Sequence, residues 1–411
     1  MSILILNDHA TITGGAAKVA IEEAVGLANF GKKVHFWAGG TASDPILDHP
    51  NISVKLSGQE DPLMQLGASP IAAMKDAFHN TFFVKVMRQW LDEVGGDDPI
   101  EIAHIHAYSK ILTGGVVEPL QERNLATVLT LHDYFSACPN GGLYNYKTQS
   151  NCGYTPLGMS CVFCSCDSRN MAFKIFRILR QKRFQTDGIP NDIDGFIAVT
   201  AFSRQILEPF LPISRPVMTL LNPITVNRLD LVNAAQNQVF LSSGRISPEK
   251  GMDVFALGCE RAAIKGKIVG AGVQLEELKQ RFTQLEFTGW LTGEDYIHAF
   301  SQVRAFVMAS RWQEPEGLVY LEAAARGIPI IAASDTAAEQ FVLEFDAGKV
   351  FPNGDVQALS EILKDVSRDD AWVAEKGRNA RLALENQSRD MPTHIQSLLN
   401  IYDETLKSKM K

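Results

Sequence analysis

Two glutamates near residue 320 stand in a setting that suits the binding of a sugar or a nucleotide. Glu314 directly precedes Pro315, and Glu322 lies eight positions later, beyond Gly317. Proline is tolerated at the start of a helix, and glycine lets a ligand approach the backbone closely. We therefore predict a helix that begins near Pro315, with free N–H groups for a diphosphate and two carboxylates for hydroxyl groups. For an isolated pair of glutamates, an acidic first turn is the alternative.

Two cations lie upstream of this motif. Arg245 and Lys250 follow a short apolar run at 239–243. Cations near a diphosphate would stabilise the negative charge that a departing nucleotide diphosphate gains in the transition state. Taken alone, an arginine and a lysine at this spacing would belong to a solvated surface.

The elements that must position these residues are strands and helices in regular alternation. Apolar runs predict buried parallel strands in both halves of the chain, with helical segments between them. The expected strands lie at 3–6, 34–37, 103–106, 127–131 and 195–199, and then at 239–243, 267–270, 285–289, 305–309 and 329–333. The sequence thus predicts an α/β fold with two doubly wound Rossmann-like domains that face each other across a cleft.

Histidines end two of the predicted strands in the first half. His106 and His132 follow neighbouring apolar runs. Because ligands of doubly wound sheets bind at the carboxyl ends of the strands, we expect both rings at the cleft. A structural histidine at a strand end is the alternative for each of them.

Together these segments resemble the retaining glycosyltransferases of family 4, which have the GT-B fold. Glu314 and Glu322 match the E-x7-E motif of that family, and the segment 243–251 resembles its G-R-x-x-x-E-K-G segment. The loop with Gly14 and Gly15 is similar to its Gly-Gly-Ala loop. The resemblance spans nearly the whole chain.

The resemblance implies a nucleotide-diphosphate sugar as donor and no divalent metal for catalysis. Arg245 and Lys250 would bind the diphosphate, and Glu314 the sugar. These three and His106 would be the catalytic residues, while the leaving phosphate assists the incoming hydroxyl. The other donor contacts would come from Gly14, Gly15, His132, Gly317, Leu318 and, at the ribose, Glu322.

The expected domain boundaries follow the same resemblance. Residues 1–221 would form an acceptor-side domain with a cysteine-rich insertion at about 134–170. Residues 222–391 would form the nucleotide-sugar-binding domain. A helix within 392–411 would return to the first domain.

Two positions depart from the family pattern. Glu316 stands where many relatives have an apolar residue, and a carboxylate there would be unfavourable near phosphates unless it points outward or meets the sugar. The loop 334–339 lacks the Gly-Gly pair that relatives often have. This second departure leaves the identity of the donor open.

Five of the six cysteines lie between Cys138 and Cys166. Disulfides are rare in a reducing compartment, so this density predicts a metal site, and tetrahedral zinc needs four ligands. Relatives from bacterial polysaccharide clusters have a similar segment, which implies Cys138, Cys152, Cys161 and Cys166 as the ligands. An iron–sulfur cluster is the rival, and free or disulfide-bonded cysteines are the remaining alternative.

The segment 171–184 carries five cations and no acidic residue. Apolar residues alternate with these cations at helical spacing. Such a helix could lie on an anionic membrane surface and bring the cleft to a lipid-linked acceptor. A core-packing helix with a basic outer face explains the pattern equally well.

Composition limits the classes of protein that need to be considered. The chain has 411 residues, of which 45% are hydrophobic, enough for two cores. The net charge of −8 argues against nucleic acid as a partner. The chain has no apolar run that spans a bilayer and no basic start of a signal peptide. We therefore expect it in the cytoplasm, at most peripheral on the inner face of the membrane.

These features predict a retaining glycosyltransferase of bacterial surface polysaccharide synthesis. Its acceptor would be a saccharide, most simply a lipid-linked one. A GT-B nucleotide-sugar epimerase, which would act without an acceptor, is one alternative. A non-catalytic nucleotide-sugar-binding partner is the other.

Overall fold

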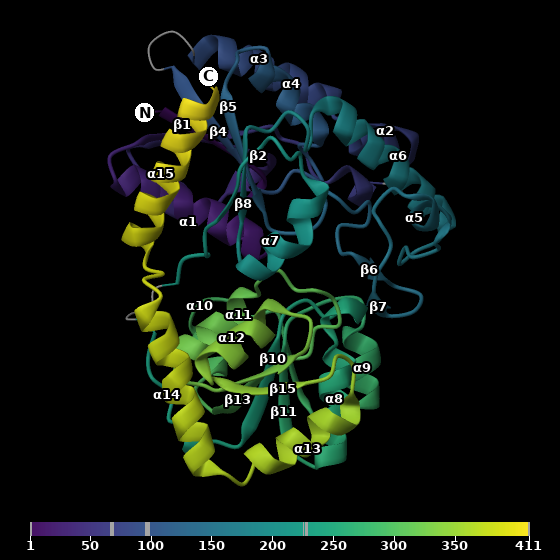
Figure 1. The fold of residues 1–411 in the computed structure, drawn as a ribbon, viewed down its shortest axis with the longest axis vertical. Helices are drawn as coiled ribbons and strands as arrows, with labels where there is room; N and C mark the ends of the chain where they lie inside the picture. Colours follow the sequence, from purple (N-terminus) through teal and green to yellow (C-terminus); the bar gives the residue numbers. More distant parts are fainter. Residues whose placement is uncertain (1, 66–69, 95–98, 225, 227–228, 410–411) are drawn as a thin grey trace.

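The structure is a computed structural model that describes residues 2–65, 70–94, 99–224, 226 and 229–409. Figure 1 shows two lobes, with the first half of the chain (purple to teal) above and the second half (green) below. The yellow C-terminal helix runs back to the upper lobe.

A parallel sheet of seven strands forms the centre of the first lobe. Its spatial order is β3 (Ile52–Leu56), β2 (Lys33–Ser43), β1 (Ser2–Ala10), β4 (Ile100–Ile105), β5 (Ala126–Leu131), β8 (Gly195–Ala198) and β9 (Val217–Thr219). Residues 3–6 have no exposed surface, as expected for a strand covered on both faces.

The helices of this lobe are α1 (Gly15–Asn29), α2 (Pro70–Phe78), α3 (Thr81–Val94), α4 (Val117–Gln121), α6 (Met171–Asp187) and α7 (Ala201–Leu207). An insertion between β5 and α6 contains the short antiparallel pair β6 (Tyr144–Asn145) and β7 (Ser150–Asn151), and then α5 (Met159–Phe163).

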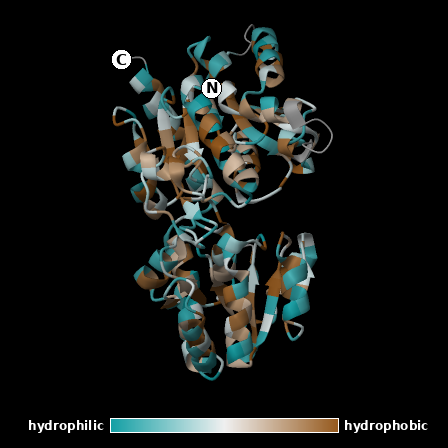
Figure 2. Cartoon of the chain, turned by 90° about the vertical axis from the view of Figure 1, so that its right-hand side faces the viewer, coloured by the Kyte–Doolittle hydropathy of each residue, from teal (hydrophilic) through white to brown (hydrophobic). Residues whose placement is uncertain are grey.

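The second lobe has a parallel sheet of six strands. Its spatial order is β12 (Glu286–Gly289), β11 (Lys265–Val269), β10 (Val239–Ser243), β13 (Val303–Met308), β14 (Ile330–Ala333) and β15 (Gly348–Phe351). Its helices are α8 (Met252–Ala262), α9 (Leu275–Arg281), α10 (Gly293–Ala299), α11 (Leu318–Ala325), α12 (Ala337–Phe345), α13 (Val356–Val366) and α14 (Asp370–Asn386). Figure 2 shows brown, hydrophobic strands inside both lobes.

The predicted fold class is confirmed: the chain is α/β, with two parallel sheets in two doubly wound lobes. Within the two parallel sheets, the described strands that the apolar runs did not predict are β3, β9 and β15, each at the edge of its sheet. Edge strands are covered less completely, so their sequences need no continuous apolar run. β3, for example, has no fully buried residue.

The order of the strands reverses at one point in each sheet. In the first sheet β1 lies between β2 and β4, and in the second β10 lies between β11 and β13. Ligands of doubly wound sheets bind at such switch points, beyond the carboxyl ends of the strands. The loops after β1, β4, β10 and β13 therefore hold the candidate site.

The C-terminal helix α15 (Met391–Lys409) packs on the first lobe. Ile395 and Leu398 are fully buried in the cluster that includes the inner face of α1. A Cβ atom at Gly26 of α1 would come within 2.7 Å of the Ile395 side chain, so glycine permits the close crossing. None of the helices in the described ranges combines the length and hydropathy needed to cross a bilayer.

Candidate active site

Glu314 lies in the loop after β13 and is fixed by three donors. Lys250 Nζ lies 2.7 Å and 2.6 Å from its two carboxylate oxygens. Ser310 Oγ and Trp312 Nε1 donate to Oε2 at 3.0 Å and 2.7 Å. Burial alone would raise the pKa of Glu314, but Lys250 and the other donors hold this pKa below its ordinary value. Glu314 is therefore an ionised carboxylate held in one orientation.

Glu322 lies on α11 and is held from both lobes. Lys18 Nζ, on α1 of the first lobe, lies 2.7 Å from Oε1, and the Tyr296 hydroxyl donates to Oε2 at 2.6 Å. Burial would lower the pKa of Lys18, but Glu322 raises it overall, so the ammonium stays charged. The ion pair joins the two lobes, because α1 follows β1 of the first sheet and α11 follows β13 of the second.

The helix predicted to begin near Pro315 is present, but it starts later. Helix α11 begins at Leu318, and its N-cap is Gly317, whose φ of 89° lies in the left-handed region. Pro315 lies in the preceding loop, where its carbonyl accepts a hydrogen bond from Thr200 at 2.7 Å. No side chain caps the helix, so its first N–H groups are available, as the diphosphate prediction requires.

The loop with Gly14 and Gly15 lies against the start of α11. A Cβ atom at Gly15 would lie 3.5 Å from Leu318 Cδ1, whereas one at Gly14 would meet no atom within 4 Å. The predicted donor residues of the two lobes are therefore brought together at this point.

Arg245 lies in the loop after β10, and its side chain is 66% exposed. Its guanidinium lies 3.6 Å from Glu249 Oε1. Lys250 is 18% exposed by comparison. Arg245 is thus near the site without the fixed geometry of Lys250.

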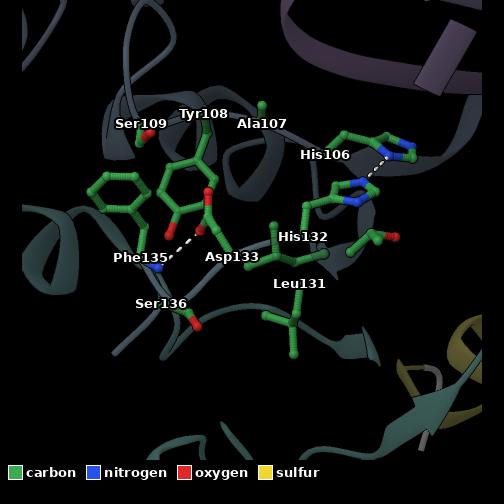
Figure 3. Close-up of a pocket in the computed structure, with 11 residues that line it drawn as sticks. His106, Ala107, Tyr108, Ser109, Leu131, His132, Asp133, Phe135 and Ser136 are labelled. Atoms are coloured by element: carbon green, nitrogen blue, oxygen red, sulfur yellow. Dashed lines mark hydrogen bonds between the residues drawn. The ribbon is translucent and has the colours of Figure 1, made fainter. Parts of the chain in front are cut away.

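The two predicted histidines line a small pocket at the carboxyl ends of β4 and β5. His106 Nδ1 and His132 Nε2 lie 2.9 Å apart, as Figure 3 shows. The pocket is also lined by Asp133, whose Oδ1 accepts a hydrogen bond from Phe135 N at 2.9 Å. Burial lowers the pKa of His132 to about 3 and raises that of Asp133 to about 6. His132 is therefore neutral at pH 7.

Comparison with known proteins adds to this geometry. Residues 225–389 match the family model described as glycosyl transferases group 1. This segment, which lies in the second lobe, is similar to group 1 glycosyl transferases. A GDP-mannose-dependent alpha-(1-6)-phosphatidylinositol monomannoside mannosyltransferase of Mycolicibacterium smegmatis is 30% identical over 181 residues, which are 39% of this chain and 47% of the relative. The chain thus spans less than half the length of the curated relatives that it matches.

Solved glycosyltransferase structures match the whole chain in fold. Sucrose-phosphate synthase of Thermosynechococcus elongatus has a TM-score of 0.75 at 18% identity and covers 99% of both chains. The Anabaena protein HepE in complex with UDP-glucose has a TM-score of 0.66 at 18% identity, covering 99% of this chain and 100% of its own. The chain has the GT-B fold.

Glu316, the first departure from the family pattern, is held by partners on the segments that connect the lobes. This buried carboxylate lies 2.7 Å from Arg389 Nη1 and accepts a short hydrogen bond of 2.5 Å from Asn222 Nδ2. Both partners belong to the two segments that connect the lobes. Glu316 is therefore held by structural contacts with Arg389 and Asn222.

The glycine-poor loop before α12 turns at Asp335, whose φ is 62°, and Thr336 caps that helix.

The cysteine insertion between β5 and α6 is arranged around a lysine. Lys174 is fully buried, and its Nζ lies 3.1 Å from Cys166 Sγ and 3.6 Å from Cys161 Sγ. Sulfurs that share a tetrahedral zinc lie about 3.8 Å apart. No three cysteine sulfurs of the described chain lie within 4.8 Å of one another. As placed, Cys138, Cys152, Cys161 and Cys166 do not fit a four-thiolate zinc or iron–sulfur site.

Helix α6 does not have a basic outer face. Lys174 and Arg180 are buried, Arg177 is paired with Asp167 at 2.9 Å, and Arg183 with Asp187 at 2.7 Å. Its exposed side chains include the apolar Ile175 and Leu179, each about half exposed, and one cation, Lys182. Both of the predicted patterns for 171–184 placed the cations outside, and the structure corrects this.

Sequence reasoning missed several residues of the site. Lys18 stands one turn into α1, at a spacing from Gly14 that would place it on the cleft side. Glu23 interrupts the apolar stripe of the same helix, which is the signal that could have identified it. Trp312 and Tyr296 carried no signal, because nothing local distinguishes them from core aromatic residues.

Proposed function

We propose that this protein is a retaining glycosyltransferase that moves a sugar from a nucleotide-diphosphate donor to a saccharide acceptor. The observation that carries the proposal is that the switch points of the two sheets, where the strand order reverses, face each other. Lys18 of the first lobe binds Glu322 of the second, beside the fixed pair of Lys250 and Glu314. Charged groups of both signs are thus held where the two sheets present their ligand-binding edges.

The proposed roles follow from the charges. Lys250 and the exposed Arg245 would bind the diphosphate together with the free N–H groups at the start of α11. Glu322 would accept from ribose hydroxyls and Glu314 from the sugar. The UDP-glucose complex of HepE, a protein of the same fold, supports a donor of this class.

The acceptor side would lie at the histidine pocket. His132 and Asp133 line it, and the insertion with the exposed apolar residues of α6 follows directly in the chain. We propose a lipid-linked saccharide of bacterial surface polysaccharide synthesis as the acceptor. The name of the mannosyltransferase relative, which acts on a glycolipid, supports this class.

Membrane contact would then depend on the apolar residues Ile175 and Leu179. Ile175→Asp with Leu179→Asp should reduce co-sedimentation with phosphatidylglycerol vesicles at least threefold. Lys182→Ala, which removes the exposed cation of the same helix, is the matched control. Equal sedimentation of both variants would contradict this contact.

The function is tested by transfer and by stereochemistry. The full chain is incubated with labelled nucleotide sugars and a bacterial lipid extract, and the anomeric configuration of the product is read by NMR. We expect acceptor-dependent transfer that keeps the configuration of the donor. Donor conversion without acceptor would indicate an epimerase, inversion would exclude the retaining mechanism, and binding without turnover would indicate a non-catalytic partner.

A further inference from the structure

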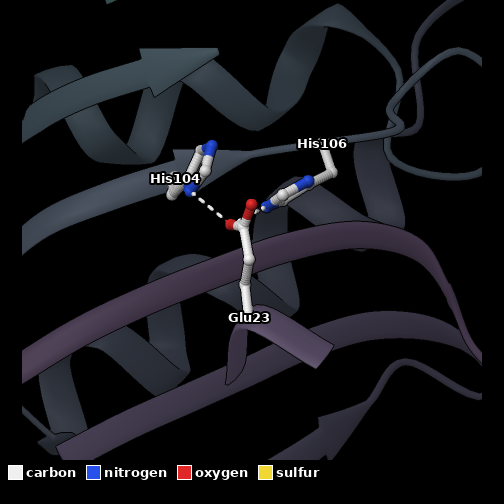
Figure 4. A group of neighbouring side chains, drawn as sticks. All are labelled: Glu23, His104 and His106. Atoms are coloured by element: carbon white, nitrogen blue, oxygen red, sulfur yellow. Dashed lines mark ion pairs between the residues drawn. The ribbon is translucent and has the colours of Figure 1, made fainter. Parts of the chain in front are cut away.

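A buried polar cluster lies directly behind the histidine pair. Glu23 comes from α1, and its side chain is 3% exposed. Its Oε2 lies 3.4 Å from His106 Nε2 and 3.5 Å from His104 Nδ1. Figure 4 shows this carboxylate between the two rings. The other oxygen, Oε1, lies 2.9 Å from His394 Nε2 on α15.

His394 carries a proton on each ring nitrogen. Its Nδ1 lies 3.0 Å from the carbonyl oxygen of Leu221, and its Nε2 faces Glu23. A carbonyl and a carboxylate can only accept, so both nitrogens donate and the ring is an imidazolium. Burial would raise the pKa of Glu23, but the surrounding histidines hold it well below its ordinary value. The pair is therefore a buried anion and cation.

The same argument places the protons of the cleft histidines. His106 Nε2 lies 3.4 Å from Glu23 Oε2, longer than a good hydrogen bond, and a carboxylate at this distance favours the proton on that nitrogen because it can only accept. His106 Nδ1 is then the acceptor, and His132 Nε2 donates to it at 2.9 Å. His132 Nδ1 remains as the atom of the pair that can accept a proton from the pocket.

A metal ion at the same place is disfavoured by the contacts of His104. Its Nδ1 lies 2.7 Å from the Tyr402 hydroxyl, and its Nε2 lies 2.7 Å from Thr130 Oγ1. Both nitrogens already have hydrogen-bond partners, so a metal would have to break one of these bonds.

We propose that Glu23 is a positioning residue for the cleft histidines. It sets the tautomers of His106 and His132, and it stabilises the charge when the pair takes up a proton. A proton that arrives at His132 Nδ1 displaces the Nε2 proton to His106 Nδ1, so the charge comes to rest on the ring beside Glu23. The inference rests on the proposed function, because it places the reacting groups at His132.

The charged groups around His106 decide its proton affinity. Glu23 faces it from α1, His394 and Tyr402 lie behind it on α15, and Asp133 lines the pocket in front. His104 and His132 are neutral, because burial lowers the pKa of both. Glu23 and His394 are therefore the charged groups behind the pair, and Asp133 adds a negative charge in front of it above about pH 6.

The test uses two variants with opposite expected effects. Glu23→Gln removes the anion, so the pair should bind its proton less tightly. The acid limb of the pH–rate profile should then move down by about one pH unit, with a lower kcat and little change in the donor KM. His394→Gln leaves Glu23 without its counter-charge, so the limb should move up. Glu344→Gln, an exposed carboxylate on α12, is the control.

A second readout does not need turnover. Ring nitrogen chemical shifts from ¹⁵N-histidine NMR should report the Nε2–H tautomer of His106 in the wild type and its loss in Glu23→Gln. The inference would be overturned if the acid limbs of Glu23→Gln and His394→Gln moved in the same direction. It would also be overturned if His106 kept the same tautomer in Glu23→Gln. If Glu23→Gln fails to fold, the upward shift in His394→Gln decides. If the wild type transfers no sugar, the proposed function fails while the NMR result still tests Glu23.

Discussion

Burial at the cleft changes the pKa of the Asp133 carboxyl group. Its carboxylate lines the histidine pocket, and burial raises its pKa to about 6 from an ordinary value of 3.8. A raised pKa means that the folded state binds the proton more tightly than the unfolded chain. Ionised Asp133 therefore lowers stability above about pH 6, and this penalty disappears below about pH 4.

This sign gives a prediction for Asp133→Asn. The variant keeps an acceptor for Phe135 N and removes the titrating group. We expect it to be more stable than the wild type by about 1–3 kcal/mol at pH 8 and equal to it at pH 4. Urea unfolding at the two pH values measures this, with Glu344→Gln as a control. A variant that is less stable at pH 8 would contradict the assignment.

The sequence located most of the charged residues that lie near the carboxyl ends of the strands, because they follow apolar runs whose ends can be located. Glu314, Glu322 and Lys250 lie at the predicted edge of the sheet, and His106 and His132 meet as expected. It could not predict Lys18 or Glu23, because their partners are more than 80 residues away. Contacts of that kind depend on how the helices pack, which no local pattern specifies.

At the scale of elements, the insertion between β5 and α6 gave the largest difference between expectation and structure. Cysteine density predicted a metal site, and cation density predicted a basic helix surface. In the structure Lys174 turns inward and lies beside Cys161 and Cys166. Helical spacing identifies the faces of a helix, but it does not show which face is buried when both contain apolar residues.

This arrangement predicts the effect of Lys174→Met. The change removes the donor to Cys166 and Cys161 and should cost about 2 kcal/mol of unfolding free energy. Lys182→Met, which changes an exposed lysine on the same helix, should leave the unfolding free energy unchanged.

We also expect no stoichiometric zinc or iron in the wild type by elemental analysis. One equivalent of either metal, with destabilisation by a chelator, would show instead that the cysteines close around it.

At the scale of the whole molecule, a buried ion pair ties one of the segments that join the lobes to the loop before α11. Glu316 pairs with Arg389 at 2.7 Å, and their side chains are 2% and 5% exposed. Burial raises the pKa of Glu316 although Arg389 opposes this. Single removal of one partner leaves an uncompensated buried charge, which is the costly case.

We therefore expect Arg389→Leu to lose about 3–5 kcal/mol of unfolding free energy. The double variant Glu316→Leu with Arg389→Leu should recover most of this loss, because no charge is left unpaired. Chemical unfolding of the four proteins of the cycle measures the coupling. A double variant as unstable as the single one would show that the pair does not act as a unit.

The central claim is that the cleft binds a nucleotide-diphosphate sugar through Lys250 and Glu314. The most direct measurement is the melting temperature of the full chain with UDP, GDP, ADP, dTDP and their sugar conjugates. We predict that nucleotides of one base family raise the melting temperature, because a ligand that binds only the folded state stabilises it. This stabilisation should be lost in Lys250→Met and kept in Glu344→Gln. No response to any nucleotide, or an undiminished response in Lys250→Met, would contradict the account.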